Sequence, residues 1–250
     1  MRDVELQLPS VPMAENWNLE TLKALRSAVY RRDRGDVADL IRGHPVGDVL
    51  QTIGDVAVIA VEDGAPGWPE LAAQCIAALR DRGWAGDVDL ADQLDAASAA
   101  TPPALRSLPV ELEELCSILE GDLMNSGGMI DLRTGQTWPD VVLEDSGEEV
   151  FDEDELEDST RWLHVESIGS RDGYRDMVDF AGTITDPRLA GQLDVALDGR
   201  GAFRRFKNVL SEAPEEFTRF MLFSDERKLG RAREWLAAAG YRVRLESRRP

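Results

Sequence analysis

Cysteine and histidine are scarce in this 250-residue chain, and their scarcity excludes several kinds of site. The sequence has two cysteines, Cys75 and Cys116, and two histidines, His44 and His164. A disulfide-based fold needs more cysteines, and no spacing of Cys and His matches a zinc site. We therefore interpret both cysteines as buried apolar residues of helices, and we expect no bound metal ion or cofactor.

Long apolar runs and a leader sequence are also missing. No stretch approaches the ~18 apolar residues of a membrane span, and the first residues, MRDVE, lack the charged and then apolar pattern of a signal peptide. Hydrophobic residues still make up 43% of the chain, which is too much for a disordered protein. We expect a folded, cytoplasmic protein that makes no contact with membranes.

Positive charge is scarce and unevenly placed. The chain has 28 Lys and Arg against 48 Asp and Glu, and its formal net charge is -20. Proteins that bind nucleic acid over a broad surface depend on clustered Lys and Arg, so this charge excludes a general nucleic-acid binder. However, residues 1–160 carry a net charge of -23 and residues 161–250 carry +3. A local anion site is therefore compatible with the last third of the chain.

The strongest run of negative charge lies between Asp140 and Asp158, with 11 carboxylates and no Lys or Arg. Like charges at this density repel one another, so we predict a solvated acidic loop over residues 140–158. The run lacks the glycine-punctuated spacing of a calcium loop. Beyond solubility, this loop can mask the chain's own arginines, or it can act as a decoy that binds a basic nucleic-acid-binding protein.

The sequence pattern predicts an α+β protein with a helical N-terminal domain and a C-terminal α+β domain. Residues 1–16 are predicted to be a flexible tail. Apolar residues at helical spacing, interrupted by glycines, predict a stack of helix hairpins over residues 17–98. The proline-rich residues 99–109 predict a linker. Helical and alternating segments follow in residues 110–250, and they predict a small, mostly antiparallel sheet.

Several local signals mark the ends of elements. Asn18 is a predicted N-cap of the first helix, and Asp186 before a proline is another. The alternation over residues 129–138 predicts a β-hairpin. Residues 219–223 alternate as a predicted strand, and Ser224 is predicted to cap a helix over the residues that follow.

The most distinctive feature of the sequence is a cluster of positive charge around residue 200. A helix that begins at Gly201 places Arg200, Arg204 and Lys207 on one exposed stripe. Free N–H groups at a helix start, together with the planar guanidinium groups of arginines, bind phosphate or carboxylate groups. We therefore identify Arg200, Arg204, Arg205 and Lys207 as candidate anion-binding residues. The segment matches neither a phosphate-binding loop nor a dinucleotide fingerprint.

A second charged helix start, near residue 171, can share this site. Arg171 and Arg175 lie one turn apart, as do Asp172 and Asp176, and Tyr174 can donate a hydrogen bond or stack on a ligand. Two readings compete here. The arginines either bind an external anion, or they pair with the chain's own carboxylates on the surface.

Signals for catalysis are few. His164 lies in a predicted strand two residues before Glu166 and can serve as a general base. No nucleophile motif accompanies it, so we assign no catalytic residue. An enzyme that acts on a phosphorylated or nucleic-acid substrate requires His164 or the aspartates beside the arginines.

Residues 110–242 resemble the bacterial uncharacterised protein family 0158. The resemblance rests on four segments, of which the run around Arg200 is the most specific: Leu132–Gly135, Gly169–Met177, Asp198–Lys207 and Phe223–Arg227. It implies a shared α+β fold and assigns no activity.

These observations lead to three functional hypotheses. The first is a non-enzymatic binding or regulatory protein that recognises a phosphate-bearing ligand, or a protein partner, through the arginine-rich helix start. The second is an enzyme that acts on a phosphorylated or nucleic-acid substrate. The third is the acidic decoy.

Overall fold

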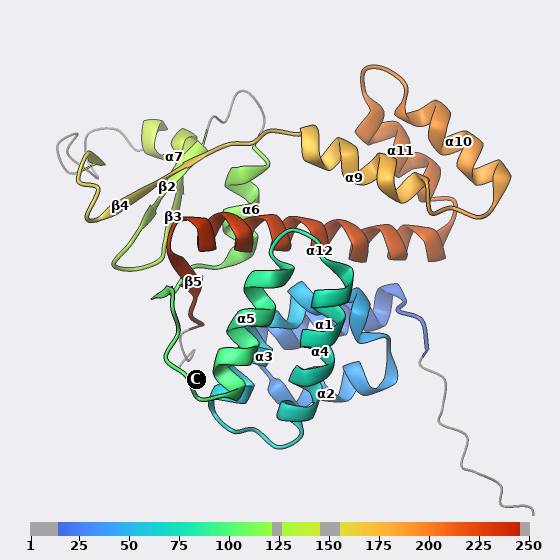
Figure 1. Cartoon of the computed structure of the whole chain (residues 1–250). Coiled ribbons are helices and arrows are strands. Elements are labelled where there is room, and N and C mark those ends of the chain that lie inside the picture. Colours follow the sequence, from blue (N-terminus) through green and yellow to red (C-terminus); the bar gives the residue numbers. More distant parts are fainter. Residues whose placement is uncertain (1–14, 122–126, 146–155, 246–250) are drawn as a thin grey trace, which may run out of the picture.

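The computed structural model describes residues 15–121, 127–145 and 156–245, and it is an α+β fold (Figure 1). The predicted fold class, with its helical N-terminal part, is confirmed. The N-terminal helices are α1 (Leu19–Arg31), α2 (Arg34–Gly43), the short 3-10 helix η1 (Val46–Asp48), α3 (Leu50–Glu62), α4 (Trp68–Arg82) and α5 (Asp87–Ser98).

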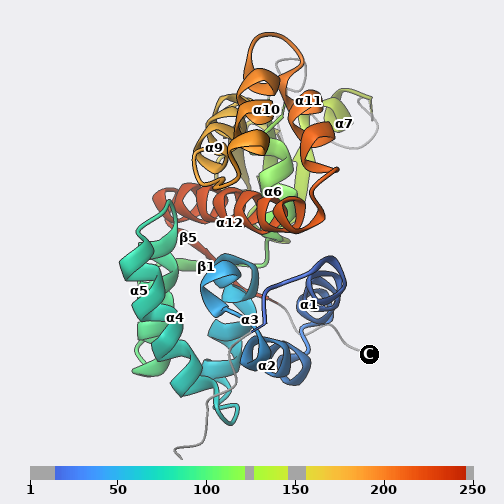
Figure 2. The ribbon, with the colours of Figure 1, turned by 90° about the vertical axis from the view of Figure 1, so that its right-hand side faces the viewer.

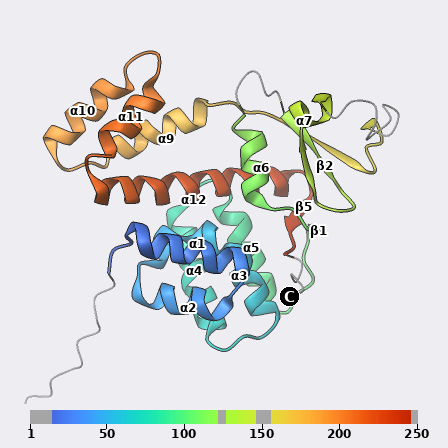
Figure 3. The same ribbon diagram turned by 180° about the vertical axis from the view of Figure 1, so that it is seen from behind.

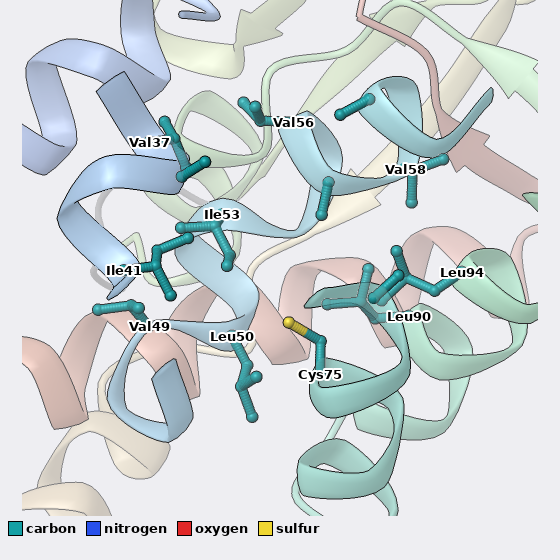
Figure 4. Packing of buried hydrophobic residues seen from close by; sticks show 14 of the residues in the cluster. Val37, Ile41, Val49, Leu50, Ile53, Val56, Val58, Cys75, Leu90 and Leu94 are labelled. Carbon is teal, nitrogen blue, oxygen red and sulfur yellow. The ribbon is translucent and has the colours of Figure 1, made fainter. Parts of the chain in front are cut away.

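The N-terminal helices pack around α3, which is apolar on almost every side. Asn18 caps α1 as predicted, because its side chain accepts hydrogen bonds from the N–H groups of Glu20 and Thr21. Figure 4 shows Ile53 and Val56 of α3 among apolar side chains of α2, α4 and α5. Since each neighbouring helix buries one apolar face on α3, the cluster forms a continuous core.

The C-terminal part contains a small sheet and two groups of helices. Its elements are β1 (Arg106–Leu108), α6 (Leu112–Leu119), β2 (Gly127–Asp131), β3 (Thr137–Pro139), α7 (Asp140–Asp145), β4 (Trp162–Glu166), α9 (Arg171–Ala181), α10 (Pro187–Leu197), α11 (Ala202–Leu210), α12 (Pro214–Ala238) and β5 (Tyr241–Val243). Three strands form an antiparallel sheet in the order β3-β2-β4. The predicted hairpin is confirmed, and Met129 of β2 lies between Trp138 of β3 and His164 of β4.

Two further strands lie outside this sheet. β1 and β5 pair in parallel, with Ser107 opposite Arg242. β1 lies within the predicted linker at residues 99–109, so this segment contains regular structure that pairs with the end of the chain. The predicted domain boundary itself stays a prediction.

The predicted strand at residues 219–223 is wrong, because α12 runs through it as one helix of 25 residues. Ser224 lies within this helix and does not begin one. The alternating pattern of these residues resembles a strand because α12 is covered on several sides. Phe220 and Leu222 are both buried, in different apolar clusters. A helix that is covered from two directions loses the single apolar stripe by which helices are recognised in a sequence.

α12 is the helix that connects the N-terminal helices with the other elements of the C-terminal part. Figure 2 shows it crossing between the N-terminal helices and the layer that contains α6, α9, α10 and α11. Leu229, Ala232 and Leu236 of α12 pack with α6 and the strands. We call α9, α10 and α11 the three-helix unit. Its core is aromatic, with the rings of Phe180 and Phe206 both packed edge-on against Phe220 of α12.

Only part of the predicted acidic loop is described. Residues 140–145 form α7, whereas residues 146–155 lie outside the described residues, as do residues 1–14 of the predicted tail. None of the helices in the described part of the chain combines the length and the apolar character that a membrane span requires.

Candidate functional site

The start of α11 presents the arginine-rich segment much as the sequence predicts. Gly201 is the N-cap residue, with a φ of 81° that favours glycine. Phe206 and Leu210 are buried on the inner side of α11, while Arg200, Arg204 and the other outward residues are exposed. The helical periodicity therefore turns the positive charge outward.

The start of α9 lies beside the start of α11. The Phe203 ring packs against Gly173, where a Cβ atom would lie 3.4 Å from the ring, and it remains 40% exposed. The Tyr174 hydroxyl donates a hydrogen bond to the carbonyl of Leu197, at 3.1 Å, which ties α9 to the end of α10. The two predicted halves of the site are therefore brought together.

Four cations of this surface have no partner among the residues that the structure describes. The side chains of Arg171, Arg200, Arg204 and Lys207 form no hydrogen bond or ion pair with any residue in the described part of the chain, and all four residues are exposed. We call these four residues the open cation set.

Arg205 differs from its neighbours, because its guanidinium group turns inward. It donates hydrogen bonds to the carbonyl oxygens of Ala196 at 3.2 Å, of Gly199 at 3.4 Å, and of Asp198 and Arg200. These carbonyls belong to the end of α10 and the turn into α11. Arg205 therefore holds the turn that presents the open cation set.

The remaining predicted residues of α9 are neutralised internally. Arg175 pairs with Asp172 at 3.0 Å on the surface. Asp176 is buried and accepts hydrogen bonds from Arg227 at 2.9 Å and from Arg231 at 2.9 and 3.2 Å. Asp176 is therefore a structural contact between α9 and α12, and of the surface pairing predicted for α9 the structure contains the pair of Arg175 with Asp172.

A second group of buried charges joins α12 to the N-terminal helices. Glu226 of α12 accepts hydrogen bonds from the N–H groups of Gln51 and Thr52, each at 2.8 Å, and from Arg82 at 2.9 Å. Since no side chain of its own segment caps α3, Glu226 caps this helix from a distance. Burial raises the pKa of the Glu226 carboxyl, against the opposing effects of Arg82 and the two N–H groups.

The neighbours of Glu226 extend this group. Asp87 pairs with Arg82 at 2.7 Å and is fully buried. Arg233, whose side chain is 1% exposed, pairs with Asp55 at 2.7 Å and donates to Gln51 at 2.8 Å. We call the whole set the junction network: Gln51, Thr52, Asp55, Arg82, Asp87, Glu226 and Arg233. Its members come from three separate stretches of the sequence, so no local pattern predicts it.

The histidine predicted as a base lies on a different element from the arginines of α11. His164 is exposed on β4, and Figure 1 shows β4 and α11 near opposite ends of α12. Asp172, an aspartate of α9 that could act as a base, forms an ion pair with Arg175. Across the described ranges, no group of three or more His, Cys, Asp or Glu residues is arranged to hold a metal ion.

Comparisons with known proteins add no assignment. No family model, curated protein or solved structure matches the chain. The resemblance to uncharacterised protein family 0158 therefore stays a prediction.

Proposed function

We propose that this chain is a non-enzymatic binding protein that recognises a phosphate-bearing ligand where α9 and α11 begin. The observation that carries the proposal is the open cation set. Its four side chains form no ion pair in the described part of the chain, although the sequence contains 48 carboxylates. Exposed cations that attract no internal carboxylate remain available to an external anion.

The surroundings of the open cation set suit a ligand that also has a flat apolar part. Phe203 and Tyr174 are 40% and 39% exposed beside the cations. Guanidinium groups bind phosphate through paired N–H donors, and aromatic rings stack on planar groups. A nucleotide combines both features, whereas inorganic phosphate uses only the first.

The alternatives receive less support. An enzyme would need a base near Arg204, and His164 lies on a distant strand. The acidic decoy rests mainly on residues that the structure does not describe. The two cysteines are free thiols, which fits the proposed cytoplasmic location.

Binding measurements on two charge-matched variants test the proposal. Fluorescence anisotropy and calorimetry with inorganic phosphate, ATP and a short single-stranded oligonucleotide compare the natural chain with Arg200→Ala/Arg204→Ala. We expect affinity for the best of these probes to fall by at least about tenfold, since two charge-assisted contacts are lost. The affinity of the natural chain should also decrease as salt is added.

The control is Lys23→Ala/Arg188→Ala, which removes the same amount of charge. Lys23 is exposed on α1, and Arg188 is exposed at the opposite end of α10 from Leu197. This variant should bind like the natural chain. The proposal fails if no probe binds, or if both double variants lose affinity equally.

A further inference from the structure

The open cation set lies on a part of the molecule that the N-terminal helices do not cover. Figure 3 shows the three-helix unit on the opposite side of α12 from these helices, with the turn from α10 into α11 directed away from α12. Arg200 lies in this turn, and Arg204 and Lys207 follow it on α11. We call these three residues the cation row. An extended ligand therefore reaches the row without meeting the N-terminal helices.

The length of the cation row corresponds to several phosphate groups. Seven positions separate Arg200 from Lys207, which amounts to about 10 Å at the rise of an α-helix. A stacked strand of nucleic acid carries one phosphate for every 3.4 Å or so of its axis, so a row of about 10 Å runs beside about three phosphates. A short strand therefore matches the row along its whole length, whereas an isolated phosphate group uses only part of it.

Exposed carboxylates lie beyond both ends of the cation row. Asp198 precedes Arg200 by two residues, and Glu212 follows Lys207 by five. Both are exposed, and their charge repels phosphates that extend past the row. The net charge of -20 adds to this repulsion over the rest of the surface. A long strand therefore gains little from contacts beyond the row, which limits the footprint to a few nucleotides.

Two aromatic side chains beside the cation row are held in place. The Tyr174 hydroxyl bonds the carbonyl of Leu197, and the Phe203 ring packs on Gly173, yet each residue keeps an exposed part. A ring that is already ordered loses little entropy when a base stacks on it. Since the two rings belong to different helices, they offer surfaces for two bases, and a mononucleotide has only one.

We propose that the open cation set binds single-stranded nucleic acid over a footprint of about three or four nucleotides, with phosphates along the cation row and unpaired bases on Phe203 and Tyr174. This inference rests on the proposed phosphate site and names the class of ligand that it takes. A duplex is disfavoured, because the faces of its bases are stacked inside the double helix and cannot reach the two rings. RNA and DNA share this chemistry, and the experiment includes both.

The length of the ligand tests the proposal on the natural chain. Fluorescence anisotropy with a labelled oligothymidylate measures the affinity of unlabelled competitors: ATP, a dinucleotide, a tetranucleotide, an octanucleotide and a stable DNA duplex, with the single strands also made as RNA. The tetranucleotide should bind at least about tenfold more tightly than ATP, because it adds a second stacked base. The octanucleotide should gain no more than about fivefold over it, since a site of about four nucleotides fits on it in about five positions.

The dependence of affinity on salt reports how many phosphates are bound. Four cations that displace counterions from a single strand give a slope of about -3 for log affinity of the octanucleotide against log salt concentration. Arg200→Ala/Arg204→Ala should reduce this slope to about half. The charge-matched Lys23→Ala/Arg188→Ala should keep the slope of the natural chain.

A change without loss of charge tests the stacking. Phe203→Leu removes one aromatic surface, and it should weaken binding of the tetranucleotide by at least about fivefold while the salt slope stays unchanged. Val88→Ala, at an exposed apolar residue of α5, is the control and should bind like the natural chain.

Three results would overturn the inference: ATP binds as tightly as the tetranucleotide, the duplex competes as well as the single strands, or Phe203→Leu leaves the affinity unchanged. The proposed phosphate site survives each of these results, because it requires only a phosphate group and the four cations.

Discussion

The junction network and the open cation set contain the same residue type in opposite situations. Arg82 and Arg233 are 13% and 1% exposed, and each contacts a carboxylate within 3 Å. Arg200 and Arg204 are exposed and have no side-chain partner in the described part of the chain. One group of arginines holds α12 against the N-terminal helices, and the other faces outward at the starts of two helices.

The difference follows from the free energy of removing a charge from water. A buried guanidinium group must find carboxylates and carbonyls, because its desolvation costs several kcal/mol. An exposed guanidinium group stays hydrated and needs no partner. The ion pairs of the junction network therefore follow from the burial of its arginines. The guanidinium groups of Arg200 and Arg204, which have no partner among the described residues, remain able to bind a ligand.

The largest effect is expected from Glu226→Ala in the junction network. This change leaves the N–H groups of Gln51 and Thr52 without their acceptor and removes one carboxylate from Arg82. We expect the free energy of unfolding to fall by about 4 kcal/mol. Urea denaturation followed by circular dichroism measures it.

Asp225→Ala is the control for this variant, at the preceding residue of α12. Asp225 pairs with Arg26, and both side chains are more than 30% exposed. Its loss should therefore cost less than about 1 kcal/mol. Equal losses for the two variants would show that Glu226 does not cap α3 from a distance.

Smaller effects on stability are expected at two glycines within helices, where substitution by alanine should act in opposite directions. A Cβ atom at Gly230 of α12 would lie 2.2 Å from the carbonyl oxygen of Ala85, so Gly230→Ala forces the backbones apart. A Cβ atom at Gly191 of α10 meets nothing within 4 Å. We expect Gly230→Ala to destabilise by about 2 kcal/mol and Gly191→Ala to stabilise by about 0.5 kcal/mol. Thermal and urea denaturation measure both changes.

These two variants also test how closely the junction is packed. If Gly230→Ala is as stable as the natural chain, α12 and the start of α5 can separate at little cost. The junction would then be less constrained than its buried ion pairs indicate.

Local signals in the sequence predicted many of the elements. Asn18 and Asp186 were predicted N-caps, and each accepts hydrogen bonds from N–H groups of the helix that follows it. Such caps act over two or three residues and can therefore be read from the sequence. The prediction of a strand at residues 219–223 failed because the elements that surround α12 come from distant parts of the chain.

The candidate site also combines features that local sequence patterns predict with features that depend on distant residues. The exposure of Arg200 and Arg204 follows from helical periodicity, which the sequence contains. The roles of Arg205 and Asp176 do not follow from it, because they depend on carbonyls at a turn and on arginines in α12. The junction network joins residues up to 182 positions apart, and a single sequence carries no local signal for such contacts.

The smallest effect is expected from Arg200→Ala/Arg204→Ala when stability is measured without a ligand. Neither side chain forms a hydrogen bond or an ion pair with a described residue, so the free energy of unfolding should change by less than about 0.5 kcal/mol. Arg205→Ala is the contrasting variant, since it removes the donor to four carbonyls, and it should cost about 1–2 kcal/mol. Urea denaturation compares the two. A loss of 1 kcal/mol or more in the double variant would mean that these arginines stabilise the fold, and their exposure would then no longer indicate a binding surface.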